Sequence, residues 1–200
     1  MDSKSLVRLP EPRRDGPLSV EQALLNRRST RAFNNDPLSL AELSQLAWSA
    51  QGVTSPRGYR TAPSAGALYP LEVFIFAGRV EGLDAGVYKY DPRHSVEKIA
   101  AGDRRADLAR AALNQSFIAT APVVFLFCAV FARMTNKYGE RGRRYVFMEV
   151  GHAAQNLCLQ AVARGMGTTV VGAFQDDRVG DMIALAPNEL PIYIVAVGKI

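Results

Sequence analysis

The order of hydrophobic and polar positions predicts a chain of short helices and strands. Two Ser-x-x-Gln/Glu capping boxes, at residues 19–22 and 39–42, predict helices that end near residue 26 and at Gly52. Residues 123–131 are continuously apolar, β-branched or aromatic, which predicts a central strand that is buried on both faces.

Weaker patterns fill the rest of the chain. Strands are expected over 71–77, 86–90, 96–99, 168–171 and 192–197, and helices over 103–113, 142–164 and 177–184. This order indicates an α+β domain rather than repeated βαβ units. Residues 1–17 contain three prolines and mixed charges, so we expect a loose N-terminal arm followed by one domain over 18–200.

The helix expected over 142–164 has an unusual surface, because it carries no charge between residues 150 and 163. Steps of three and four residues gather its polar members on one stripe: Glu149, His152, Asn156 and Gln160. A helix with few charges lies in a core or in a large interface. We expect His152 to be an interior, hydrogen-bonded side chain.

Composition places the protein among ordinary globular proteins. The chain has 200 residues, of which 48% are hydrophobic and 22% charged, and this excludes wholesale disorder. The first 16 residues lack a signal peptide's apolar core, and the longest uncharged stretch, 111–132, contains Pro122 and several polar residues. Two cysteines and two histidines lack the spacing of a metal site. We therefore expect a cytoplasmic protein with no metal and no membrane partner.

The net charge of +5 is concentrated locally. Nineteen of the 24 basic residues are arginines, and no basic tail of the kind that binds nucleic acid is present. Three arginines lie within residues 27–31, and five basic groups with one acidic group lie within 133–144. The guanidinium fork matches phosphate oxygens, so both segments are candidate anion sites. Solvated surface arginines are the alternative interpretation.

Two further segments have the residue types that chemistry requires. Residues 60–70 combine small side chains with two prolines, which lets a stiff backbone approach a flat ligand closely. Lys137 and Tyr138 are adjacent, and such a pair can donate and accept a proton when burial tunes their pKa values. The alternatives are an ordinary connecting loop for the first segment and a solvated basic loop for the second.

Four motifs in order resemble the nitroreductase superfamily of FMN enzymes. They are Arg-Arg-Ser-x-Arg at 27–31, Pro-Ser-Ala-Gly-Ala-Leu-Tyr-Pro at 63–70, Gly-His-Ala-Ala-Gln-Asn-Leu at 151–157, and Gly-Met-Gly-Thr at 165–168 followed by Gly-Ala-Phe at 172–174. Residues 60–70, 137–139 and 149–152 are similar, more narrowly, to its SagB-type, azoline-oxidase-like branch. The resemblance covers residues 19–200.

This resemblance implies the fold and the reaction. The fold would be a three-layer α+β sandwich, with helices flanking a mixed, mainly antiparallel sheet, in an intertwined homodimer with FMN at its interface. The reaction would be hydride transfer through the flavin N5, with Lys137 or Tyr138 taking a proton from an azoline or similar peptide heterocycle. The alternatives are a nitro, quinone or flavin reductase that uses NADPH or NADH on a small molecule, and a flavin-binding or sensing module without turnover.

The resemblance also implies the site residues. The FMN phosphate and ribityl chain would be bound by Arg27, Arg28, Ser29, Arg31 and Lys199. The isoalloxazine ring would lie against Pro63, Ser64, Ala65, Gly66 and Ala67. Asn156 would face the flavin or buried backbone, while Gly172 and Ala173 would present backbone to the N5 edge. Many members have Asn and Gln where this chain has Ala67 and Tyr69, so contacts there would be backbone or apolar.

Overall fold

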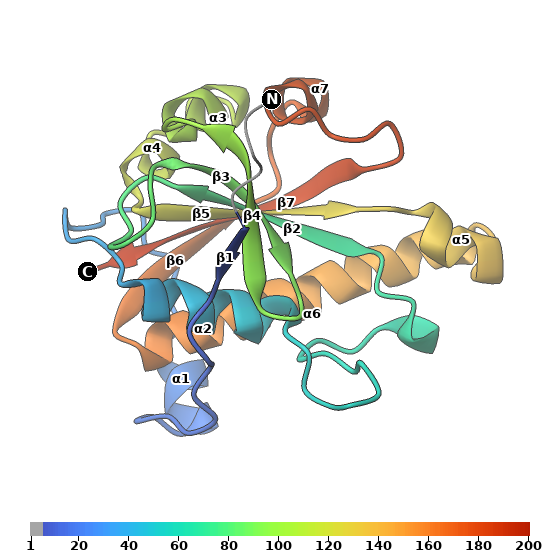
Figure 1. Cartoon of the computed structure of the whole chain (residues 1–200), viewed down its shortest axis with the longest axis horizontal. Coiled ribbons are helices and arrows are strands. Elements are labelled where there is room, and N and C mark those ends of the chain that lie inside the picture. The colour runs from blue at the N-terminus through green and yellow to red at the C-terminus, as the bar shows by residue number, and fades with distance from the viewer. Residues whose placement is uncertain (1–5) are drawn as a thin grey trace.

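A computed structural model describes residues 6–200, which fold around one seven-stranded sheet (Figure 1). Its strands are β1 (Leu6–Arg8), β2 (Leu71–Ala77), β3 (Gly86–Asp91), β4 (Ser95–Ala101), β5 (Val123–Ala129), β6 (Met166–Val171) and β7 (Leu190–Lys199). Their spatial order is β1-β4-β3-β2-β5-β7-β6, and every neighbouring pair is antiparallel. The sheet is therefore antiparallel and not mixed as the resemblance implied, and among the described residues parallel pairing occurs only in isolated bridges outside the strands, such as Ser29 with Thr168.

Helices cover both faces of this sheet, which gives the expected three-layer α+β sandwich. The helices are α1 (Val20–Asn26), α2 (Leu40–Gln51), α3 (Arg105–Ala111), α4 (Phe117–Thr120), α5 (Ala132–Tyr138), α6 (Arg141–Ala163) and α7 (Asp176–Met182). In Figure 1, α1, α2 and α6 lie below the sheet, α3, α4 and α7 lie above it, and α5 lies at one end. Both predicted capping boxes are present, at the starts of α1 and α2.

The central strand β5 shows why its sequence is apolar throughout. Alternate side chains enter the core that contains α2 and α6: Val123, Phe125, Phe127 and Ala129. The others enter the core beneath α3, α4 and α7: Val124, Leu126 and Cys128. All seven are buried, as the continuous hydrophobic run predicts. Burial raises the pKa of the thiols of Cys128 and Cys158, and both cysteines are free.

The expected strand over 123–131 is too long by two residues. Val130 donates its N–H to the carbonyl of Pro70 (2.9 Å) instead of continuing the ladder, and Phe131 then begins the turn into α5. Lys137 and Tyr138 therefore lie in the last turn of a helix and not in a loop, and Lys137 is exposed while Tyr138 is half-buried.

The N-terminal segment is held more firmly than a loose arm. Residues 1–5 of it lie outside the described part of the chain, but β1 pairs with β4 and extends the sheet. Further along, the backbone N–H and carbonyl of Arg13 bind the side-chain amide of Gln45 on α2, at 2.8 and 3.0 Å. These contacts fix the segment across α2.

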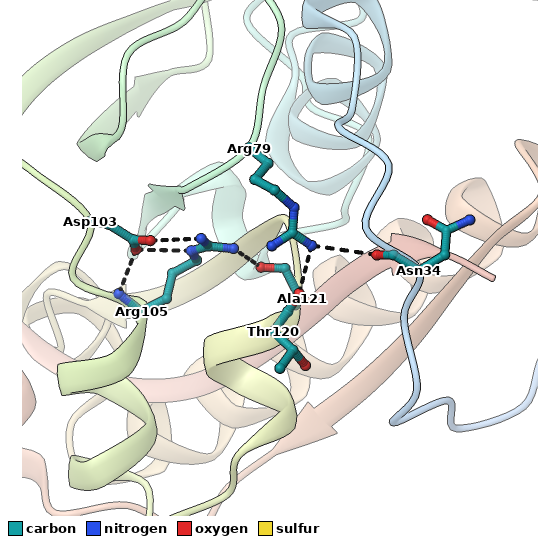
Figure 2. A network of polar contacts seen from close by, with 6 residues as sticks. All are labelled: Asn34, Arg79, Asp103, Arg105, Thr120 and Ala121. Carbon is teal, nitrogen blue, oxygen red and sulfur yellow. Dashed lines mark hydrogen bonds and ion pairs between the residues drawn. The ribbon is translucent and has the colours of Figure 1, made fainter.

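A buried arginine fixes the turn between α4 and β5 (Figure 2). Arg105 is 5% exposed and donates to the carboxylate of Asp103 from Nε (2.9 Å) and Nη2 (2.6 Å). Its Nη1 donates to the carbonyl of Ala121. Gly78 makes room for this guanidinium, because a Cβ at that position would overlap it.

A second arginine extends the same network. Arg79 donates to the carbonyls of Thr120 (2.8 Å) and Asn34 (3.4 Å), as Figure 2 shows. Carbonyls at a helix C-terminus lack intrahelical partners, so these two arginines supply donors at the end of α4. The network therefore stabilises the connection into the central strand.

Two negative findings hold for residues 6–200. No helix there is both long enough and apolar enough to cross a membrane. No group of histidine, cysteine, aspartate and glutamate side chains there is arranged to hold a metal ion.

Candidate functional site

The small-residue loop at residues 63–67 (loop 63–67) is held in one conformation. Ser64 Oγ accepts the N–H of Tyr69 (2.9 Å), and the N–H of Ala67 donates to the Ser64 carbonyl (3.0 Å), which closes a 3₁₀ turn, η1 (Ala65–Ala67). Gly66, Ala67 and Tyr69 have left-handed φ angles of 63°, 53° and 46°. Such strain in non-glycine residues persists only where surrounding contacts impose it, and it is common at functional sites.

Two helices hold the segment around loop 63–67 from outside. Asn156 on α6 donates from Nδ2 to the carbonyl of Thr61 (3.2 Å). Arg133 on α5 donates from Nη1 to the carbonyl of Tyr69 (3.0 Å). Asn156 therefore binds backbone, which is one of the two roles expected for it. Pro63, Gly66 and Ala67 remain exposed between these anchors.

Lys137 and Tyr138 lie directly against Gly66. A Cβ added to Gly66 would be 2.7 Å from Tyr138 Oη and 2.9 Å from Lys137 Nζ. The Tyr138 ring is half-buried and packs edge-on against Tyr145, with ring centres 5.2 Å apart. The structure thus joins two predicted segments that are far apart in sequence. An amine and a phenol meet at the surface of loop 63–67.

A cavity of about 370 Å³ brings together two of the predicted phosphate-binding residues, Arg27 and Ser29. Its other walls come from α6, β6 and β7: Gly151, Ala154, Gln155, Cys158, Thr168, Val170 and Tyr193. Backbone pairing fixes this wall, because Thr30 donates its N–H to the carbonyl of Thr168 (2.8 Å). A guanidinium and a hydroxyl in one cavity suit a phosphate group.

The neighbouring arginines are directed elsewhere. Arg28 donates from Nη1 to the carbonyls of Leu25 (2.8 Å) and Arg27 (2.7 Å), at the end of α1. The guanidinium of Arg31 lies 5.8 Å from the ring centre of Phe117 on α4. Arg27 and Arg31 are thus associated with helices on opposite faces of the sheet.

The remaining predicted contacts are dispersed around this edge of the sheet. Lys199 Nζ lies 3.6 Å from the carboxylate of Glu42, in the second capping box. Gly172 and Ala173 are exposed just after β6. A Cβ at Gly172 would be 3.8 Å from the Tyr193 ring, which also lines the cavity, so this glycine lies beside it.

Glu149 is a candidate site residue for which the sequence predicted no role of its own. It is 2% exposed, and neither carboxylate oxygen has a hydrogen-bond partner among the described residues. Burial raises its pKa to about 7, against the opposing influence of Ser64, Arg60 and Gln51. The available sequence signal was its position on the polar stripe of α6.

The expectation for His152 on the same stripe was wrong, because this side chain is exposed. At about 100° per residue, a three-residue step leaves His152 roughly 60° away from Glu149 around the helix axis. That rotation brings it to the side of Met148 and Gln155, which are also exposed. The polar stripe therefore runs from the interior to the surface.

Large apolar side chains remain exposed on the same side of the molecule as α1 and α6. They are Val20, Leu24 and Leu25 on α1, and Phe147 and Met148 on α6. Exposed apolar side chains that gather on adjacent helices are typical of an interaction surface.

Comparison with known proteins gives a consistent assignment. The model of the nitroreductase family matches residues 24–199. The chain is 46% identical to MJ1384 of Methanocaldococcus jannaschii, provisionally named a nitroreductase, over 91% of each chain. It is 29% identical to the microcin B17-processing protein McbC of Escherichia coli, over 81% of this chain and 62% of McbC. The chain thus spans less than two thirds of McbC.

A solved structure has the same fold. The crystal structure of a provisionally named nitroreductase from Ralstonia eutropha JMP134 superposes with a TM-score of 0.86. The sequence identity is 30%, and the match covers 100% of this chain and 91% of the other.

Proposed function

Because the chain belongs to the nitroreductase family and is an oxidoreductase, we propose that it uses FMN. We further propose that loop 63–67 and the pair Lys137–Tyr138 form its active site. The observation that carries the proposal is the contact of Lys137 and Tyr138 with Gly66. It places two proton-transfer groups beside a strained loop of small residues.

The residues of the structure fit FMN. Arg27 and Ser29 would hold its phosphate in the 370 Å³ cavity, by charge-assisted hydrogen bonds. The exposed backbone of loop 63–67 would lie against its ring. When bound, FMN supplies hydride acceptance and donation. The protein supplies position, electrostatics and proton transfer.

The finer proposal is a SagB-type dehydrogenase that oxidises an azoline or similar heterocycle. Such an oxidation removes a hydride and a proton from adjacent substrate atoms. Tyr138 Oη or Lys137 Nζ would take the proton, since both lie at the loop surface. Similarity to McbC, which processes microcin B17, supports this substrate class.

A reductase that takes electrons from NADPH or NADH is the second candidate. The basic residues of α5 and the start of α6 favour it, because Arg141 and Arg144 are exposed and available to a nucleotide phosphate. The same segment is partly neutralised, however, since Arg133 is paired with Glu72.

We also propose that the protein acts as a homodimer. The exposed apolar residues of α1 and α6 offer a surface that a second copy could cover, and a two-fold axis is the commonest symmetry of such a contact. In a dimer, loop 63–67 of one protomer would face the phosphate cavity of its partner.

Purification and a visible spectrum test the proposal directly. We expect a yellow protein that sediments as a dimer and shows an oxidised-flavin band near about 450 nm. Bleaching of this band by NADPH or NADH would identify the reductase. Bleaching by an azoline-containing peptide would identify the SagB-type dehydrogenase. A purified protein that shows no band from bound flavin, even after incubation with FMN, would contradict cofactor use. A monomeric mass would contradict the dimer.

Replacement of Gly66 by alanine is expected to reduce turnover about tenfold or more while leaving the protein folded. The new Cβ would displace Tyr138 Oη and Lys137 Nζ, and misplacement of reacting groups by about 1 Å lowers rates up to about a hundredfold. Because alanine is strained at this left-handed φ, we also expect the free energy of unfolding to fall by about 1 kcal/mol.

Gly58→Ala is the matched control. Gly58 also has a left-handed φ (79°), but nothing lies within 4 Å of its added Cβ. We expect a similar loss of stability in urea unfolding and unchanged turnover. Equal losses of turnover in both variants would show that backbone strain, and not contact with the pair, is responsible.

A further inference from the structure

A buried carboxyl group lies behind loop 63–67 and is not used in the proposed chemistry. Glu149, on α6, is 2% exposed, and both of its side-chain oxygens lack hydrogen-bond partners among residues 6–200. Gln51, the last residue of α2, is fully buried, and its Nε2 also lacks a partner there. Gln51 is one of the groups that act on the Glu149 carboxyl, so a carboxyl group and an unused amide donor occur together in the interior.

Ser64 connects this pair to the loop. Its Oγ accepts the N–H of Tyr69 at 2.9 Å, which leaves the hydroxyl hydrogen of Ser64 free to be donated. Ser64 and Gln51 both favour the ionised form of Glu149, as hydrogen-bond donors do for a carboxylate. Ser64 is therefore bound to the loop on one side and faces Glu149 on the other.

The charged group that acts on Glu149 is Arg60. Its Nη1 donates to Gln51 Oε1 (3.0 Å), and its guanidinium lies 4.4 Å from the ring centre of Tyr69. The elements around Glu149 thus contribute the neutral Gln51 from α2, and Arg60 with Ser64 from the segment around the loop. Lys137 and Tyr138 of α5 meet the loop at Gly66.

We propose that Glu149 is a positioning residue, whose carboxyl group tightens loop 63–67 through Ser64 when it is ionised and relaxes it when it is protonated. The ionised carboxyl attracts the free hydrogen of Ser64 and the amide of Gln51. Donation by the hydroxyl makes Ser64 Oγ a better acceptor for the N–H of Tyr69, because linked hydrogen bonds polarise one another. Through the contact with FMN, this inference rests on the proposed function.

The direction of the pH dependence follows from the burial of Glu149. Burial raises its pKa to about 7, so the carboxyl group is neutral at pH 6 and ionised at pH 8. We therefore expect the loop to be looser below pH 7 and tighter above it. The change is centred in a range where surface carboxyl groups do not titrate.

Hydrogen exchange of the cofactor-free protein tests this inference. After correction for intrinsic exchange rates, protection of the Tyr69 amide should rise about fivefold between pH 6 and pH 8, as a neutral hydrogen bond gains charge assistance. The isosteric variant Glu149→Gln should show no such rise. Glu81→Gln, which removes an exposed carboxyl from the turn after β2, should behave as the unmodified protein.

A second variant and a second measurement keep the outcome decisive. Ser64→Ala removes the acceptor, so the Tyr69 amide should exchange rapidly at both pH values. The FMN phosphate also gains charge over this range, so FMN affinity should rise with pH in both proteins, and more steeply in the unmodified protein than in Glu149→Gln. Constant protection of the Tyr69 amide in the unmodified protein, or an equal rise of that protection in Glu149→Gln, overturns the inference. Failure to bind FMN at any pH overturns the proposed function alone.

Discussion

Tyr138→Phe is expected to lower turnover by about 10²- to 10⁴-fold and to leave FMN affinity unchanged, which is the range that a positioned acid or base contributes. The substitution removes one oxygen, the Oη that would meet a Cβ of Gly66 at 2.7 Å, and keeps the ring that packs on Tyr145. Lys137→Ala should have a similar effect if its amine is the proton acceptor. The pair shares one location, so the two variants identify which group moves the proton.

The measurement is single-turnover bleaching of bound FMN, with whichever compound reduces the unmodified protein. Tyr145→Phe is the control, because it removes a hydroxyl from the ring next to Tyr138 without touching the loop contact. It should bleach at the normal rate. Normal bleaching in both Tyr138→Phe and Lys137→Ala would remove this pair from the mechanism.

Arg27→Ala is expected to weaken FMN binding by about tenfold to a hundredfold, which corresponds to the loss of one charge-assisted hydrogen bond to phosphate. Arg27 lines the 370 Å³ cavity together with Ser29. Fluorescence titration of the cofactor-free protein with FMN measures the change.

Arg28→Ala separates a direct contact from the general effect of positive charge. Both variants lose one charge at adjacent positions, but Arg28 uses its guanidinium on the carbonyls at the end of α1. We expect its FMN affinity to fall by about threefold or less, as for a screened charge several ångströms away. Equal losses in the two variants would contradict a phosphate site in the cavity.

The elements that sequence predicts well are those in which local signals and burial agree. The capping boxes at residues 19–22 and 39–42 begin α1 and α2, and the uninterrupted apolar run forms β5. The long helix α6 also begins and ends within one residue of its expected limits. In each case one short segment contains the whole signal.

Helix α5 was not predicted because its hydrophobic pattern is too sparse. Met134 is its one fully buried side chain, and basic or polar residues occupy most other positions. Its packing against α6 stabilises it, and such tertiary support routinely outweighs local propensity.

The candidate site was predictable in its motifs but not in its arrangement. The motif at residues 27–31 suggested one cluster, whereas Arg27 lines a cavity beside α6 and Arg31 lies against Phe117 of α4. The segment crosses the sheet edge where Ser29 pairs with Thr168, so residues close in sequence separate in space. Glu149 was hidden for the same reason, because the groups that act on its carboxyl (Ser64, Arg60 and Gln51) lie far away in the chain.

The two ends of the sheet have a consequence for aggregation. An open edge strand offers unpaired backbone groups to which another chain can add. Here one edge is β1, of which three residues lie in the described part of the chain, and the other, β6, is covered where Thr30 binds the carbonyl of Thr168. Both edges are therefore poor templates for strand addition, and growth of the sheet into fibrils is disfavoured. Any assembly with a second copy is left to the helices.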